Sequence, residues 1–314
     1  MRPKIAVVTG PTATGKTALG VLLAETMNGE VVSADSMQIY KGMDIGTAKP
    51  APEETRGVPH HMIDVADPAE NYSVARYVEE ASVCVDGIIS RGKLPILVGG
   101  TGLYIDSLIA GRNFAGAPGD DSLREELNRR YDELGGRAML EELAKVDPER
   151  AARLHPADRK RIVRALEVWR LTGKTITEHD EETKKIPPRY DAACIALSFK
   201  NRQHLYDRIN RRVDQMVEQG LFREVDGLLK SGLSEKCTAM QAIGYKEAVA
   251  ALQGRISFEE AVETIKRETR RYAKRQLTWL RRKPDVFWLL WDGDPDYEAG
   301  LRISTEFLRS LGIK

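Results

Sequence analysis

The segment from Gly10 to Thr17 constrains the fold of this chain most, because it matches the pattern G-x-x-x-x-G-K-[ST]. The apolar run Ile5–Val8 precedes it, and apolar residues at helical spacing follow it from Lys16 to about Met27. A strand, a glycine-rich loop and a helix in this order are the setting in which the pattern binds phosphate groups. The predicted phosphate-binding residues are Gly10, Pro11, Thr12, Ala13, Thr14, Gly15, Lys16 and Thr17.

The chemistry of this loop suits a diphosphate bound together with Mg²⁺. Its glycines allow successive backbone N–H groups to turn inward around phosphate oxygens, and the helix that follows directs its positive end at the anion. Lys16 adds a positive charge beside those oxygens, and the hydroxyl of Thr17 is the predicted protein ligand of Mg²⁺. We therefore predict that the loop binds a diphosphate with Mg²⁺ as the cofactor.

Strand-like and helix-like segments alternate through the first hundred residues and again after residue 190. Short apolar runs typical of buried parallel strands occur at Val31–Val32, Leu94–Val98, Ala193–Leu197 and Val286–Leu290. The alternation predicts an α/β fold, a P-loop NTPase-like parallel sheet flanked by helices. From Asp121 to about Leu171 nearly all of the sequence instead has helical periodicity, and strand-like sequence returns only at Ala193–Leu197. We therefore predict a core domain of residues 1–115 and 190–314 and an all-helical insertion domain of residues 116–189.

Composition matters mainly through the distribution of charge, since the net charge is only +1. Lys266–Lys283 carries nine Lys and Arg residues against one acid, Glu268. Arg159–Arg170 carries five against Glu167. Basic stripes of this kind are typical of a surface that binds a polyanion such as RNA. A solvated helical face with internal ion pairs explains them equally well.

Cysteine usage and hydropathy argue against a disulfide scaffold, a zinc site and a membrane protein. The three cysteines lie far apart, and no Cys-x-x-Cys occurs. No apolar run is long enough to span a bilayer, and the N-terminus lacks the features of a signal peptide. We expect a cytoplasmic protein with no membrane partner.

The end of the predicted strand Leu94–Val98 bears on the reaction. Many motor and signalling NTPases place a Mg²⁺-binding acid there, whereas this chain continues with Gly99-Gly100-Thr101. The acid at a strand end close to the loop is Asp35. A carboxylate in that position can act as a general base on a second substrate. A P-loop kinase for a small metabolite is one interpretation, and a nucleotide-switched RNA-binding protein is another.

Further motifs follow the phosphate-binding loop along the whole chain. They are Ser33–Tyr40, Asp44–Pro50, His60–Asp64, Val98–Tyr104, Arg161–Val168 and Ile243–Glu247. With these motifs in this order, the chain resembles the tRNA dimethylallyltransferases, also called tRNA isopentenyltransferases, over essentially its whole length. The bacterial type is the better match, because the zinc finger that eukaryotic relatives often add has no Cys/His set here.

The resemblance implies transfer of a dimethylallyl group from dimethylallyl diphosphate to N6 of the adenosine 3′-adjacent to the anticodon, position 37. The loop would then hold the donor diphosphate rather than ATP, and Asp35 would be the general base. Thr101 matches a threonine near the acceptor, and Arg212 matches an arginine on the donor diphosphate, so that Asp35, Thr101, Lys16 and Arg212 form the catalytic set. The alternatives are Asp35 as a strand-end cap or as a group that binds Mg²⁺ only indirectly, through one of its ligands, and Arg212 as a solvated charge beside Arg208.

The resemblance also implies tRNA as a partner, with the anticodon stem-loop held and one base unstacked. The segments that match tRNA contacts are Asp35, Ser36, Met37 and Gln38 and, in the helical insertion, Lys160, Arg161, Ile162, Val163 and Arg164. Lys266–Lys283, with Tyr272 and Trp279, is either a second RNA surface or an amphipathic packing helix. The family favours a monomer, and a relative that modifies a free adenine nucleotide is the nearest alternative.

Overall fold

The computed structural model describes residues 2–112 and 119–313. It divides into two compact units, a core unit of Met1–Ile109 with Arg189–Lys314 and a helical unit of Ala110–Pro188. Each unit has its own hydrophobic core. The first predicted domain boundary, between residues 115 and 116, lies outside the described residues.

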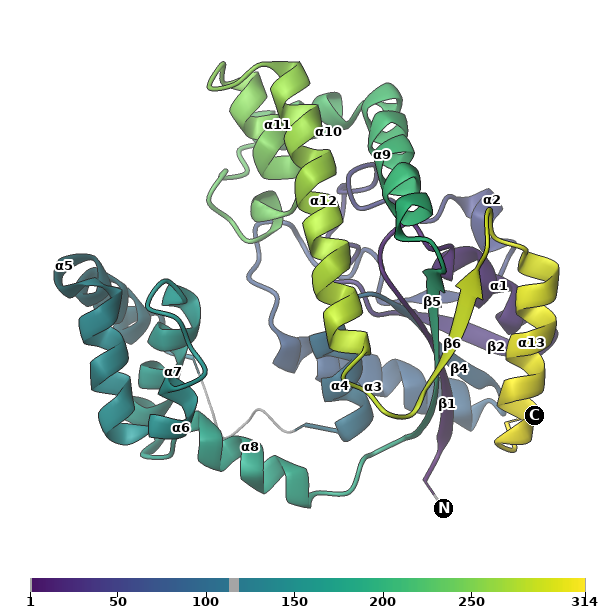
Figure 1. The fold of residues 1–314 in the computed structure, drawn as a ribbon, viewed down its shortest axis with the longest axis horizontal. Helices are drawn as coiled ribbons and strands as arrows, with labels where there is room; N and C mark the ends of the chain where they lie inside the picture. The colour runs from purple at the N-terminus through teal and green to yellow at the C-terminus, as the bar shows by residue number, and fades with distance from the viewer. Residues whose placement is uncertain (1, 113–118, 314) are drawn as a thin grey trace. The chain divides into compact units, whose positions relative to one another are not determined.

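A six-stranded parallel sheet organises the core unit, in the order β3-β2-β4-β1-β5-β6 (Figure 1). Its strands are β1 (Lys4–Thr9), β2 (Gly29–Ser33), β3 (His60–His61), β4 (Leu94–Gly99), β5 (Asp191–Phe199) and β6 (Val286–Trp291). In the register of the central strand, Ala6 lies opposite Ile96 of β4 and Ala193 of β5. The predicted parallel α/β sheet is confirmed.

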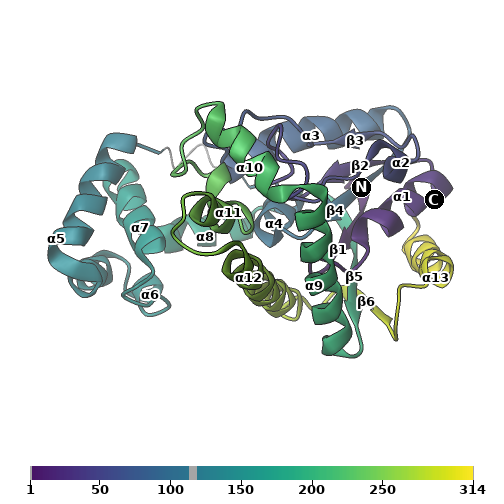
Figure 2. The same ribbon diagram turned by 90° about the horizontal axis from the view of Figure 1, so that it is seen from above.

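Helices flank the sheet and continue beyond the carboxyl ends of its strands. They are α1 (Lys16–Thr26), α2 (Pro52–Thr55), α3 (Val74–Ser90), α4 (Gly102–Ala110), α9 (Arg202–Gln219), α10 (Leu221–Lys230), the 3₁₀ helix η1 (Ala239–Gln241), α11 (Tyr245–Leu252), α12 (Phe258–Leu280) and α13 (Tyr297–Ser310). Figure 2 shows α1 and α13 on one side of the sheet and α4 and α12 on the other. In Figure 1, α9, α10 and α11 lie beyond the arrowhead of β5.

Burial of apolar side chains holds α1 against the sheet. Leu19 and Leu23 of α1 are fully buried in one cluster with Val8 and Ile96. Burial of such side chains contributes roughly 1.5–3 kcal/mol each. Because the strands are parallel, the segments that follow β1, β2 and β4 meet at one edge of the sheet. These segments contain the phosphate-binding loop, Asp35 and Thr101.

The described residues of the helical unit form α5 (Asp121–Val146), α6 (Pro148–Ala151), α7 (Arg159–Thr172) and α8 (Ile176–Lys185). Gly135, with φ of 80° and ψ of 157°, interrupts α5, where the sequence shows two glycines. Buried Leu127, Met139 and Leu166 belong to the core of this unit. Within the residues described for both units, no helix is long and apolar enough to cross a membrane.

Candidate functional site

The loop between β1 and α1 is held in shape by hydrogen bonds to its own carbonyl groups. The hydroxyl of Thr14 donates to the carbonyl of Pro11 at 2.8 Å. The indole N–H of Trp291, on β6, donates to the carbonyl of Thr14 at 3.0 Å. Gly15 has a φ of +85°, and a Cβ there would lie 2.5 Å from the hydroxyl of Tyr297, so this position requires glycine. Contacts within the protein therefore fix the conformation of this loop.

Two cations meet at this loop, and the protein environment opposes the charge of both. The ammonium of Lys16 donates to the carbonyl of Pro11 at 2.7 Å. Burial and, to a smaller extent, the charge of Arg212 lower the pKa of Lys16 to about 7, against an opposing effect of Asp35. Burial also lowers the pKa of Arg212, whose guanidinium donates to the hydroxyl of Thr12 at 3.5 Å. Two repelling cations in a partly desolvated loop favour the binding of a polyanion.

The structure separates the three arginines that lie close together on α9. Arg208 donates to the carbonyl of Ala13 at 3.1 Å and so braces the loop. Arg212 faces Thr12. Arg211 instead exposes 65% of its side chain, with an oxygen of Asp294 at 3.9 Å. The alternative of a solvated helix charge thus fits Arg211, and the structure brings Arg212 to the loop.

Asp35 and Thr101 lie together at the ends of neighbouring strands. Oδ1 of Asp35 accepts hydrogen bonds from the backbone N–H groups of Met37 at 2.9 Å and Gln38 at 3.4 Å. The hydroxyl oxygen of Thr101 accepts from the backbone N–H of Ser36 at 3.1 Å. Among the residues that the structure describes, none hydrogen-bonds to Oδ2 of Asp35. One carboxylate oxygen thus caps a turn, as the alternative predicted, and the other is available to a substrate.

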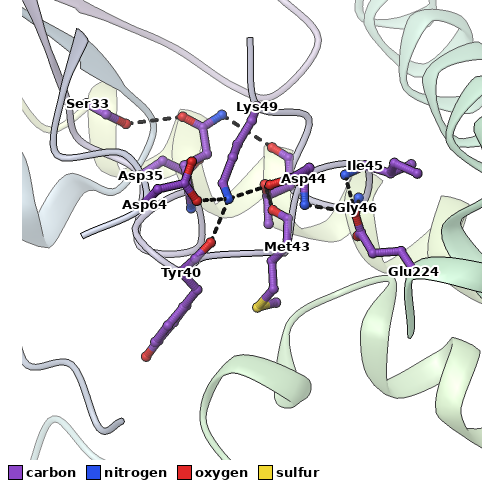
Figure 3. A network of polar contacts seen from close by, with 12 residues as sticks. Ser33, Asp35, Tyr40, Met43, Asp44, Ile45, Gly46, Lys49, Asp64 and Glu224 are labelled. Atoms are coloured by element: carbon purple, nitrogen blue, oxygen red, sulfur yellow. Dashed lines mark hydrogen bonds and ion pairs between the residues drawn. The ribbon is translucent and has the colours of Figure 1, made fainter. Parts of the chain in front are cut away.

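Gln38 is partly buried, and its side-chain amide is engaged within the protein. Its Oε1 accepts from the hydroxyl of Ser33 at 3.1 Å (Figure 3). Its Nε2 donates to the carbonyls of Thr47 at 3.3 Å and Ala48 at 3.1 Å. Ser36, Met37 and Gln38 are each partly exposed. This places the segment predicted to contact tRNA directly beside the predicted general base.

Two residues of α12 belong to this site although their role was not predicted from the sequence. Gln276 accepts from the backbone N–H of Thr12 at 3.1 Å and donates to the carbonyl of Gly100 at 3.0 Å. Burial raises the pKa of Tyr272 to about 12, and the charge of Asp35 adds to the rise while interaction with the Thr101 side chain opposes it. The sequence feature that could have indicated a shared role is the spacing of four residues between Tyr272 and Gln276, which puts both side chains on one helix face.

The remainder of the basic stretch divides between packing and solvent. The indole N–H of Trp279 donates to Oδ2 of Asp106 at 2.8 Å, and Lys283 pairs with the same carboxylate. Arg271 exposes 63% of its side chain. The packing interpretation therefore holds for Trp279, whereas Arg271 faces solvent.

In the helical unit, the residues predicted to contact tRNA lie in the first turns of α7. Lys160 and Arg161 are exposed, and 68% of the Arg161 side chain is accessible. The guanidinium of Arg164 lies 2.9 Å from Oε2 of the buried Glu167. Ile162 and Val163 have exposures of 0% and 2% in the core of the unit. Their burial argues against contact of these two side chains with RNA.

The fit of a magnesium ion rests on Thr17, in the first turn of α1. Its side chain is partly exposed, and none of the described residues forms a hydrogen bond with its hydroxyl. Within residues 2–112 and 119–313, no group of three His, Cys, Asp or Glu side chains is arranged to hold a metal. Mg²⁺ prefers octahedral oxygen ligation that includes substrate phosphates and water. Thr17 beside a bound diphosphate fits that preference.

Two family models match this sequence. The model described as IPP transferase matches residues 38–283, and the model described as isopentenyl transferase matches residues 3–67. The tRNA dimethylallyltransferase of Geobacter sulfurreducens is 51% identical over 289 residues, 92% of each chain. That of Caldanaerobacter subterraneus is 50% identical over 299 residues, 95% of each chain.

Solved structures show the same likeness. The crystal structure of the full-length tRNA isopentenylpyrophosphate transferase from Bacillus halodurans is 44% identical, with a TM-score of 0.73 over 98% of this chain and 96% of that one. A eukaryotic dimethylallyltransferase acting on tRNA is 31% identical, with a TM-score of 0.83 over 98% of this chain and 80% of that one. The match therefore extends over both units.

Proposed function

This chain belongs to the IPP transferase family of tRNA dimethylallyltransferases, which transfer a dimethylallyl group to an adenosine of tRNA, and from that membership we propose how its own residues act. The donor is dimethylallyl diphosphate. The acceptor is N6 of the adenosine 3′-adjacent to the anticodon, position 37, and the product is N6-dimethylallyladenosine. The observation that carries the proposal is the pair of cations Lys16 and Arg212, which interact electrostatically with the carboxylate of Asp35.

The donor diphosphate is bound by residues 10–17 together with Arg212. As the bond between C1 of the dimethylallyl group and the diphosphate oxygen breaks, negative charge builds on the diphosphate. Lys16, Arg212 and the backbone N–H groups of the loop stabilise that charge. The lowered pKa values of both cations support this role, because a bound diphosphate relieves the repulsion between them.

Thr17 is the protein ligand that we assign to Mg²⁺, for the reasons of fit given above. When bound, the ion would neutralise part of the diphosphate charge and so make it a better leaving group. The loop after β4 carries no acid, since Gly99 is followed by Gly100 and Thr101. This favours binding of a leaving group over phosphoryl transfer, for which a second metal-binding acid is common.

Asp35 is the general base for the acceptor. The N6 amine of adenine is a weak nucleophile, because its lone pair is delocalised into the ring. Oδ2 of Asp35 accepts one N6 proton as N6 forms its bond to C1, and the electron pair of the breaking bond leaves with the diphosphate. Oδ1 keeps its hydrogen bonds to Met37 and Gln38, so the carboxylate stays oriented. Thr101 lies beside the acceptor and holds the Ser36 backbone.

The helical unit contacts the anticodon stem-loop through Lys160, Arg161 and Arg164. The exposure of Lys160 and Arg161 supports contact with phosphates, which position RNA without reading its sequence. Residues Asp35 to Gln38 contact the unstacked adenosine and its neighbours. The proposed state is a monomer, which the family resemblance favours, and one chain supplies both the donor loop and the acceptor residues, so this site needs no second copy.

A transfer assay tests this function. The protein is incubated with Mg²⁺, dimethylallyl diphosphate labelled in the isoprenoid carbons, and unmodified tRNA, and the RNA is digested to nucleosides. We expect the label in N6-dimethylallyladenosine from position 37. Unlabelled RNA, together with phosphate transfer from ATP to a small metabolite, would contradict the proposal. Prenylation of free AMP without prenylation of tRNA would assign the acceptor to a nucleotide instead.

A further inference from the structure

Two sequence motifs, Asp44–Pro50 and Ile243–Glu247, have no part in the transfer as proposed. They lie about 200 residues apart in the sequence. The structure brings them together around one side chain, Glu224 of α10. Figure 3 shows Glu224 against the first of them, at Asp44, Ile45 and Gly46.

Glu224 binds a run of three consecutive backbone N–H groups. Its Oε2 accepts from Asp44 at 2.8 Å and from Ile45 at 2.7 Å. Its Oε1 accepts from Gly46 at 3.2 Å and from the hydroxyl of Tyr245 at 2.5 Å. Hydrogen bonds to an ionised carboxylate are about twice as strong as neutral ones. One carboxylate therefore organises the whole turn.

Tyr245, the first residue of α11, fits against this turn as well as donating to Glu224. It is fully buried, and a Cβ at Gly46 would lie 2.4 Å from its ring. Burial and the charge of Glu224 raise the pKa of Tyr245 above its ordinary value. The hydroxyl therefore stays protonated and keeps donating to the carboxylate at any physiological pH.

Lys49 closes the same loop from its other end. Its ammonium donates to Oδ1 of Asp44 at 2.6 Å, to the carbonyl of Tyr40 at 2.6 Å and to Oδ1 of Asp64 at 2.5 Å. Only 7% of its side chain is exposed. With Glu224 on one side and Lys49 on the other, the turn has little freedom to change shape.

The turn leads directly to Gln38. The carbonyls of Thr47 and Ala48, which follow Gly46, both accept from Nε2 of Gln38. The place of the Gln38 amide thus depends on the loop that Glu224 and Tyr245 hold. Gln38 itself follows Asp35 by three residues in the segment assigned to the acceptor.

We propose that Glu224 and Tyr245 are positioning residues for the tRNA acceptor, which hold the 44–48 turn in the shape that orients Gln38 beside Asp35. This inference rests on the proposed function, since it concerns how that enzyme recognises its acceptor. It assigns to α10 and α11 a role in substrate recognition although neither residue touches the substrate.

Three variants test the proposal in the full-length enzyme. Glu224→Gln loses the charge that binds three N–H groups, and Tyr245→Phe removes one hydroxyl while it keeps the buried ring. The matched control is Asp226→Asn on the same helix, because Asp226 pairs only with Lys230, at 2.6 Å, among the described residues. The measurements are KM for tRNA, kcat at saturating tRNA, and the dissociation constant of dimethylallyl diphosphate.

We expect Glu224→Gln to raise KM for tRNA about tenfold and Tyr245→Phe to raise it about threefold. The affinity for the donor and the behaviour of Asp226→Asn should match the wild type. A merely structural role would lower kcat by reducing the active fraction and would leave KM for tRNA unchanged. That result would overturn the proposal.

A double-mutant comparison checks the route through Gln38. If Glu224 acts through Gln38, then Glu224→Gln combined with Gln38→Ala raises KM for tRNA no further than Gln38→Ala alone. Multiplied effects would contradict this route. If Glu224→Gln fails to fold, Tyr245→Phe decides, and an unchanged KM for tRNA in that variant overturns the proposal. Failure of the proposed function is a different result, because the wild type would then leave tRNA unlabelled.

Discussion

Gln276 accepts a hydrogen bond from the backbone N–H of Thr12 at 3.1 Å, across 264 residues of the chain. The same side-chain amide donates to the carbonyl of Gly100, the residue before Thr101. In the proposed function, Thr12 belongs to the donor loop and Thr101 to the acceptor side of the site. One buried amide on α12 thus links the two loops, and we expect it to set the spacing between the two substrates.

Replacement of Gln276 should therefore impair the transfer more than it impairs folding. Gln276→Ala leaves the N–H of Thr12 and the carbonyl of Gly100 without this partner and frees the two loops to move apart. We expect kcat/KM to fall tenfold or more, since misplacement by about 1 Å costs on the order of a hundredfold in rate. Steady-state kinetics check this, with exposed Glu259→Ala on the same helix as the control. A change within twofold would show that the amide does not set this spacing.

The pH dependence of donor binding should report on Lys16. Because its pKa is about 7 in the free protein, the lysine is largely neutral at pH 8.5, and diphosphate binding must return the proton. We expect affinity for dimethylallyl diphosphate to weaken about tenfold from pH 6.5 to 8.5, with proton uptake on binding. Calorimetry in buffers of different ionisation enthalpy measures the uptake.

Two variants isolate the contribution of Lys16 from titration of the ligand itself. Lys16→Met should abolish the protein's share of the proton uptake. Arg212→Met removes a repelling charge, so the midpoint of the pH dependence should move upward. Equal proton uptake in the wild type and in Lys16→Met would refute this assignment.

The same shifted lysine makes a prediction about stability. The folded-state pKa of Lys16 lies below its unfolded value, so the protonated form disfavours the folded state at low pH. That penalty is fully present below about pH 7 and disappears as the pH rises toward the ordinary lysine value of 10.5. Lys16→Met should therefore melt above the wild type at pH 6, with a smaller difference at pH 9. Thermal unfolding at the two pH values measures the difference in melting temperature between the variant and the wild type. A difference that grows as the pH rises would contradict the prediction.

Replacement of the exposed cations of α7 should weaken RNA binding and leave the affinity for dimethylallyl diphosphate unchanged. We expect Lys160→Glu with Arg161→Glu to raise KM for tRNA about tenfold at low salt. The slope of affinity against salt should fall by about one for each phosphate that the variant no longer binds. Arg302→Glu on α13, where 65% of the side chain is exposed, serves as the control. An unchanged salt slope would place the RNA elsewhere.

Features that depend on neighbouring residues in the sequence were predictable. The donor loop, Lys16 and the strand-end position of Asp35 follow from local spacing, and the structure brings them to one edge of the sheet. The sequence does not reveal where α9 ends and α10 begins, because Gly220, with φ of 105°, ends one helix and begins the next in a single residue.

Contacts between distant parts of the chain could not be predicted from local patterns in the sequence. The role of Gln276 depends on partners in two loops that lie 264 and 176 residues away in the sequence. Arg208, Arg211 and Arg212 lie within about one helical turn and have the same side chain. Only the packing of α9 against the loop distinguishes them, through the carbonyl of Ala13 and the hydroxyl of Thr12.

The most direct test of the central claim compares the wild type with Asp35→Asn in a single turnover from a preformed enzyme–donor complex. Asparagine keeps an oxygen that accepts from Met37 and Gln38, so the turn survives while the base is lost. We predict that Asp35→Asn binds dimethylallyl diphosphate as tightly as the wild type and transfers the label to tRNA roughly 10²–10⁴-fold more slowly. Transfer at the wild-type rate, or loss of donor binding with Asp35→Asn, would contradict the assignment of Asp35 as the general base beside a separate diphosphate site.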